Sequence, residues 1–86
     1  MTLRQKFMRR KSLVTSREGD TFEIVFNPLT KKLIVKCVNV HGLAFRSAIE
    51  ELMKNSGLKI LEDDGIMDIT YKCESYDEYQ KCLSKI

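Results

Sequence analysis

The chain has 86 residues, of which 43% are apolar and 31% are charged, with one proline and four glycines. That composition fits one small globular domain and argues against disorder over most of the length. No run approaches the roughly 18 apolar residues that cross a membrane, and the N-terminus lacks the apolar segment of a secretory signal, so we expect a cytoplasmic protein that does not enter a membrane.

Charge is uneven along the chain. Residues 1–18 carry six basic side chains and one acidic one, whereas residues 19–86 carry nine basic and eleven acidic ones. We therefore divide the chain into a basic N-terminal arm, 1–18, and a single α+β domain, 19–86. The arm has room for a short strand near 12–16, because Ser-Leu-Val-Thr-Ser favours extended backbone and a turn signal containing Gly19 follows it.

The first half of the domain predicts a hairpin followed by a helix. Apolar residues alternate over 21–27 and 32–40, which is the period of a half-buried strand, and Asn27-Pro28 between them favours a turn. Residues 43–55 change to a helical period, and Gly57 is expected to end that helix in the left-handed conformation. The apolar stripe of this helix comprises Phe45, Ala48, Ile49, Leu52 and Met53.

The second half repeats that order of elements. Residues 58–62 and 66–73 predict two more strands, joined by a hairpin turn at Asp63-Asp64-Gly65. Ser75 and Glu78 have the spacing of a capping box, so a last helix is expected from residue 76 to about residue 85. The order is ββαββα, and we expect a two-layer α+β sandwich, with a four-stranded antiparallel sheet and both helices on one face.

The strand and helix periods also assign residues to the two faces of the sheet. Ten apolar residues are expected to be buried together: Phe22, Ile24, Leu33, Val35, Phe45, Ile49, Leu52, Ile69, Tyr71 and Leu83. The opposite face is expected to be solvated or to form the binding surface, and it carries Glu23, Lys32, Lys36, Asp68, Thr70 and Lys72. This layout, over residues 20–86, resembles that of small two-layer α/β proteins of unknown function known from archaea. No motif carries the resemblance, so it implies a fold and no activity.

The sequence contains few residues that could form a catalytic or metal-binding site. The three cysteines, Cys37, Cys73 and Cys82, are odd in number and widely spaced, which predicts reduced core thiols rather than disulfides. The single histidine, His41, is too few for a usual zinc site. His41 has no evident nucleophile or orienting partner in the sequence, so we assign no catalytic residue, cofactor or metal and do not expect an enzyme.

Residues 42–48 resemble the active-site segment Gly-Leu-His-Ala-Arg-Pro-Ala of the histidine-containing phosphocarriers of sugar transport. Four of the seven positions agree: Gly42, Leu43, Arg46 and Ala48. The position of the phosphorylated histidine is Ala44, however, and that family places one strand before its first helix where this chain has two. We therefore expect no phosphotransfer.

The basic arm is the strongest functional lead. Lysine and arginine side chains grip phosphates and an aromatic ring stacks on a base, which predicts weak nucleic-acid binding by Arg4, Lys6, Phe7, Arg9, Arg10 and Lys11. The same composition fits a solvated tail. Two functions stay open: a small non-enzymatic binding or protein-interaction module, which we favour, and nucleic-acid binding through the arm. The sequence identifies neither a protein partner nor the oligomeric state.

Overall fold

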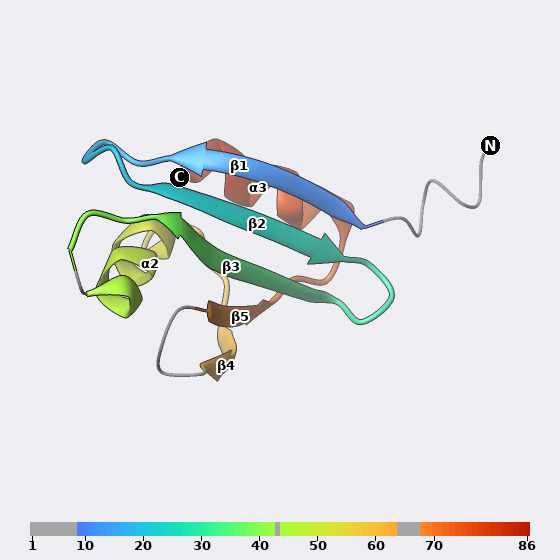
Figure 1. Ribbon diagram of the computed structural model, residues 1–86. Coiled ribbons are helices and arrows are strands. Elements are labelled where there is room, and N and C mark those ends of the chain that lie inside the picture. Colours follow the sequence, from blue (N-terminus) through green and yellow to red (C-terminus); the bar gives the residue numbers. More distant parts are fainter. Residues whose placement is uncertain (1–8, 43, 64–67) are drawn as a thin grey trace.

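The computed structural model describes residues 9–42, 44–63 and 68–86. Strands and helices follow one another along these residues (Figure 1): β1 Arg10–Thr15, β2 Thr21–Asn27, β3 Lys32–Asn39, α2 Phe45–Met53, β4 Ile60–Asp63, β5 Asp68–Lys72 and α3 Tyr76–Lys85. The expected turn at Asp63-Asp64-Gly65 falls mainly outside the described residues. Within the described residues, no helix has the length and apolar character needed to cross a bilayer.

The strands form one open antiparallel sheet in the order β1-β2-β3-β5-β4. The expected antiparallel pairs β2–β3 and β4–β5 are both present, and the pairing of β3 with β5 joins them. The expectation of four strands is wrong, because β1 adds a fifth strand beside β2. This strand overlaps the one considered near residues 12–16, although it begins earlier, at Arg10.

β1 lacks the apolar alternation of the other strands because its inner face is largely polar. Register with the buried face of β2 turns Arg10, Ser12 and Val14 toward the helices. The hydroxyls of Ser12 and Tyr79, 67 residues apart in the chain, are hydrogen bonded, and the Arg10 guanidinium lies 5.2 Å from the centre of the Tyr76 ring. This strand is therefore stabilised by contacts with α3, which is far from it in the chain, and a local sequence pattern cannot reveal such contacts.

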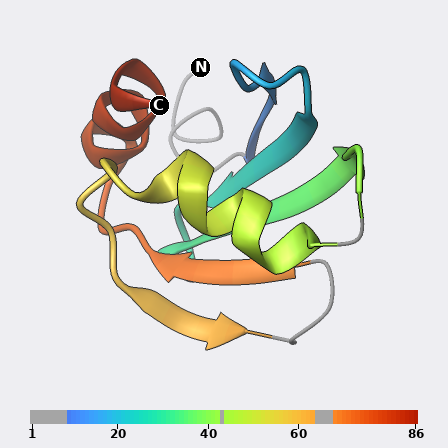
Figure 2. The ribbon, with the colours of Figure 1, turned by 90° about the vertical axis from the view of Figure 1, so that its left-hand side faces the viewer.

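Both helices cover the same face of the sheet (Figures 1 and 2), and Figure 2 shows the sheet curving around α2. α2 lies against β3 and β5. α3 lies behind β1 and β2 in Figure 1, where the rings of Tyr79 and Phe26 stack with centroids 5.4 Å apart. Of the ten residues expected to be buried together, eight belong to the buried core, whereas Phe45 and Leu83 are partly buried and pack against it.

The predicted start of α3 agrees with the structure, whereas the predicted end of α2 does not. α2 begins after Ala44, which makes no side-chain capping bond, and its C-cap is Lys54. Gly57, with φ of +80°, therefore redirects the chain beyond the helix and does not occupy the expected position directly after the cap. α3 begins as predicted, because the Ser75 side chain accepts a hydrogen bond from the backbone N–H of Glu78 at 3.2 Å.

Candidate functional site

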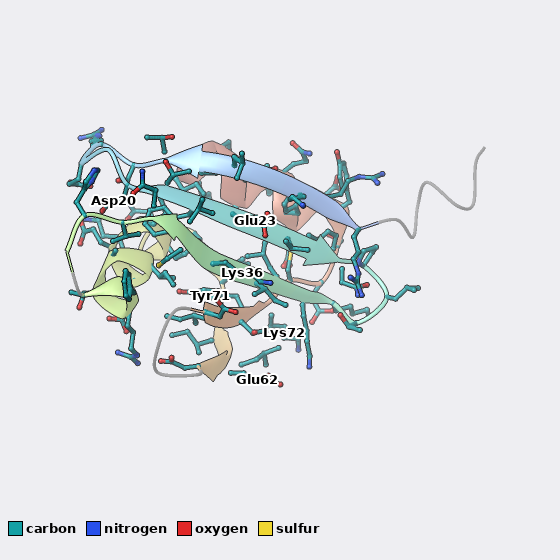
Figure 3. The ribbon with its side chains drawn as sticks, viewed as in Figure 1. Asp20, Glu23, Lys36, Glu62, Tyr71 and Lys72 are labelled. Atoms are coloured by element: carbon teal, nitrogen blue, oxygen red, sulfur yellow. The ribbon has the colours of Figure 1, made fainter. Side chains whose placement is uncertain are left out.

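The face of the sheet opposite the helices carries no layer of its own in the described part of the chain. Cross-strand register aligns its side chains in rows over β2, β3 and β5: Glu23, Lys36 and Asp68, and beside them Val25, Ile34 and Thr70. Figure 3 shows Glu23, Lys36 and Lys72 on neighbouring strands. All six residues that the sequence assigned to this face lie on it. We call this surface the open face.

The centre of the open face is apolar. Val25 and Ile34 are half-buried and lie directly opposite each other on β2 and β3. Leu13 of β1 lies diagonally beside Val25 and is 68% exposed, and Val38 lies farther along β3 with 57% exposure. The strand period already puts Val25, Ile34 and Val38 on this face, but Leu13 was missed because sequence analysis did not place β1 in the sheet. Apolar side chains that gather on an uncovered surface are typical of an interaction site.

Charges of both signs border the apolar centre. The Lys11 Nζ lies 3.5 Å from Glu23 Oε2, and the Lys32 Nζ lies 3.3 Å from Glu62 Oε2. Exposed ion pairs of this kind add little to stability, but they reduce the field that each lysine projects into solvent. Among the described residues, the open face carries four lysines and three carboxylates: Lys11, Lys32, Lys36, Lys72, Glu23, Glu62 and Asp68. Its charge is therefore close to balanced.

The structure divides the predicted nucleic-acid contacts into two groups. Three of them lie outside the described residues: Arg4, Lys6 and Phe7. Arg9 is exposed and precedes β1, whereas Arg10 and Lys11 belong to that strand. Arg10 lies over the Tyr76 ring and Lys11 pairs with Glu23, so both are held against the domain. The arm as predicted is therefore partly a strand of the sheet.

Further lysines gather at the end of the sheet where β1 begins. Register places Lys32 opposite Lys72, and Lys31 precedes β3. The carboxylate of Glu74 lies 2.9 Å from the Lys72 Nζ and 3.6 Å from the Lys31 Nζ. The hydrogen bond from Lys72 lowers the pKa of Glu74 and raises the pKa of Lys72, so both groups stay charged and partly offset each other.

At the other end of the sheet, His41 has a carboxylate partner that no sequence spacing revealed. One oxygen of Asp20 accepts the backbone N–H of His41 and lies 3.0 Å from its Nδ1. The bond from the backbone N–H is the main reason that the pKa of Asp20 is lowered. An Asp–His pair orients the imidazole in some catalytic sites, but within the described residues no hydroxyl or thiol is hydrogen bonded to the other ring nitrogen. The pair serves as a clamp between the β1–β2 turn and the loop after β3.

An open cavity of about 780 Å³ lies beside this clamp. Its walls come from the β1–β2 turn, the loop after β3, α2 and the end of α3, and charges of both signs line it, including Arg17, Glu18, Glu51 and Lys85. The volume suits a small molecule, but specific sites in proteins are mostly apolar with a few converging polar groups. The mixed lining favours no particular class of ligand.

The three cysteines are free and buried, as the sequence predicted. Burial raises the pKa of Cys37, and it raises the pKa of Cys73 and of Cys82 to about 11. Because the thiolate is the nucleophile and the metal ligand, none of the three is suited to chemistry in the folded protein. Across the described ranges, no group of three or more His, Cys, Asp or Glu side chains is placed to hold a metal ion.

Comparison with known proteins found no similar one: no protein-family model matches this chain, and neither does any curated protein or solved structure. A function for the chain therefore has to be inferred from the surfaces described above.

Proposed function

We propose that this protein is a non-enzymatic interaction module that binds another protein through the open face of its sheet. The observation that carries the proposal is the uncovered apolar centre formed by Leu13, Val25 and Ile34. A sheet face that is only solvated usually alternates polar residues, whereas apolar residues on it gain free energy when a partner removes them from water. The three buried, unpaired thiols support a reducing compartment such as the cytoplasm.

The charge of the open face favours a protein partner over a polyanion. Interfaces between proteins usually have an apolar core and a polar rim of mixed sign, and the lysines and carboxylates around Ile34 fit that description. Nucleic-acid interfaces are instead strongly positive, because binding depends on neutralising phosphates. The complementary partner would present apolar side chains to Val25 and Ile34 and charges of both signs around them.

Replacing Ile34 with lysine is expected to weaken binding to the partner by about tenfold or more, because it puts a charge at the apolar centre of the interface. Immobilised protein would be exposed to extract of the source organism, and the proteins retained would be identified and titrated against each variant. Leu29→Lys is the matched control, since it makes the same chemical change at an exposed residue of the β2–β3 turn. Equal retention of a partner by the parent and by Ile34→Lys would rule out this face.

Nucleic-acid binding is the second candidate, favoured by the basic end of the sheet. Arg9 precedes β1 at the end of the sheet where Lys31, Lys32 and Lys72 lie, so basic residues from separate parts of the chain gather at this end. Glu62 and Glu74 offset part of that charge. Any such binding should therefore be weak, nearly independent of sequence and strongly dependent on salt.

Titration of labelled duplex and single-stranded oligonucleotides at several salt concentrations tests this candidate. If about four to five duplex phosphates are neutralised, the slope of log K against log salt is expected to be near −4. Arg9→Gln should reduce the steepness of the slope by about 1, whereas Arg17→Gln, at the opposite end of β1, should leave it unchanged. Absence of binding at about 20 mM salt, where screening is weakest, would exclude this candidate.

A further inference from the structure

We propose that two copies of this chain join edge to edge through β1, so that their sheets continue across a two-fold axis as one antiparallel sheet. The inference does not rest on the proposed function, because it concerns the edge of the sheet and the proposed function concerns its face, although Leu13 belongs to both. The occupant of the edge is a second copy, and the argument depends on how the two edges of the sheet differ.

The β4 edge is protected against pairing. Natural edge strands avoid association by being short, bulged or charged. β4 has four residues, and its register with β5 shifts between Ile60 and Glu62. It therefore offers a second chain only a short and irregular row of backbone groups.

The β1 edge has fewer of these protections. β1 has six residues in unbroken register with β2, and it contains neither a bulge nor a proline. Its two cations have partners in their own domain, since Lys11, with a side chain that is 66% exposed, pairs with Glu23, and Arg10 lies over the Tyr76 ring. Leu13, at 68% exposure, stands on the open face of this strand. The described residues leave β1 as the outermost strand on its side of the sheet.

Charge and side-chain direction select one register for the pairing. In a two-fold antiparallel pair, opposite residues point to the same face of the sheet, so the axis passes beside one residue of each strand. An axis at Leu13 places Leu13 opposite its equivalent, Lys11 opposite Thr15 of the second copy, and Ser12 opposite Val14 of the second copy. An axis at Lys11 would place two lysines opposite each other, which is destabilising, and an axis at Val14 would pair only residues 13–15 of each strand. An axis at Ser12 would place Lys11 opposite Leu13 of the second copy, so the two leucines would not meet.

The register at Leu13 also uses the exposed apolar surface. The two Leu13 side chains meet on the open face and shield each other from water, and this burial of apolar surface stabilises the cross-strand pair. The hydrogen bond between the hydroxyls of Ser12 and Tyr79 fixes β1 onto α3 in each copy. Because opposite residues of the pair point to the same face, the helices of both copies lie on one side of the continuous sheet, and the two open faces lie together on the other.

Sedimentation equilibrium of the full chain over a range of concentrations tests the dimer. A single strand pair is a small interface, so the average mass is expected to rise from monomer toward dimer with concentration. Leu13→Lys should remain monomeric, because it sets two lysines opposite each other, while its circular dichroism spectrum shows that it is folded. Leu29→Lys is the matched control, since Leu29 is also 68% exposed and lies in the β2–β3 turn. A parent that is monomeric up to about 1 mM would overturn the proposal.

Disulfide formation tests the register independently of the lysine variant. Leu13→Cys brings two thiols together across the axis, where directly opposite Cα atoms are about 4.5–5.5 Å apart, a separation that a disulfide spans, so oxidation is expected to yield a covalent dimer. Thr15→Cys is the control, because in this register its two thiols are separated by four residues along the strands, roughly 13 Å. Native cysteines are buried in each copy and do not compete. Equal cross-linking of the two variants, or faster cross-linking of Thr15→Cys, would contradict the proposed pairing.

Discussion

Replacement of Phe26 by alanine is expected to lower the free energy of unfolding by about 3–5 kcal/mol. Phe26 has no exposed surface, and its ring stacks on Tyr79 with centroids 5.4 Å apart, so it joins β2 to α3. Loss of the ring removes buried apolar area and leaves a cavity between β2 and α3 that these two elements cannot close. Small domains have a total stability of about 5–15 kcal/mol, so the variant should be close to unfolding at moderate temperature.

Urea unfolding followed by circular dichroism measures this effect. Leu29→Ala serves as the control, because Leu29 is 68% exposed in the β2–β3 turn and its truncation removes little buried surface. The midpoint for Phe26→Ala should fall well below that of the control with a similar slope. Similar midpoints for the two variants would mean that Phe26 does not hold α3 on the sheet.

A chain that begins at Ser16, and so lacks β1, is expected to be unfolded or to lose most of its stability. Its removal takes away six cross-strand pairs with β2 and uncovers the edge of that strand. It also removes Val14, which packs against the core, and leaves the Tyr79 hydroxyl without Ser12. Losing the strand pairing, this partly buried hydrogen bond and packed apolar surface together costs several kcal/mol, on the order of the whole stability of about 5–15 kcal/mol.

The matched control for this truncation is a chain that begins at Arg9 and keeps β1. Thermal unfolding of the two chains isolates the contribution of the strand, since they differ only by residues 9–15. The chain that begins at Arg9 should unfold cooperatively, and the chain that begins at Ser16 should show no cooperative transition. Equal melting temperatures would show that β1 is dispensable and that the basic segment acts only as an arm.

The sequence predicted most of the elements because their apolar patterns are local. The alternation around Phe22 and Leu33 and the Ser75–Glu78 cap each depend on residues a few positions apart, and all three agree with the structure. β1 could not be placed in the sheet from such patterns. Its inner face is polar and is satisfied by Tyr76 and Tyr79, which lie at the far end of the chain.

The candidate site was predictable only in part for the same reason. The period-two pattern correctly assigned Lys36 and Thr70 to the open face. The same pattern puts Val25 and Ile34 on that face, but the apolar centre was not recognised as a whole, because Leu13 joins it only through the register of β1 with β2. The Asp20–His41 clamp was not recognised either, since two loops at one end of the sheet bring these residues together and no sequence spacing marks that contact.

The buried thiols provide an internal reporter of how often the domain opens. Cys37 lies on β3, Cys73 follows β5 and Cys82 lies on α3, so the three sample separate parts of the core. A thiol that is shielded and protonated reacts with an alkylating reagent only during an opening event, so its labelling rate measures the free energy of that event. Equal protection of all three would indicate that the sheet and the last helix open as one cooperative unit. Faster labelling of Cys82 would indicate that α3 detaches first.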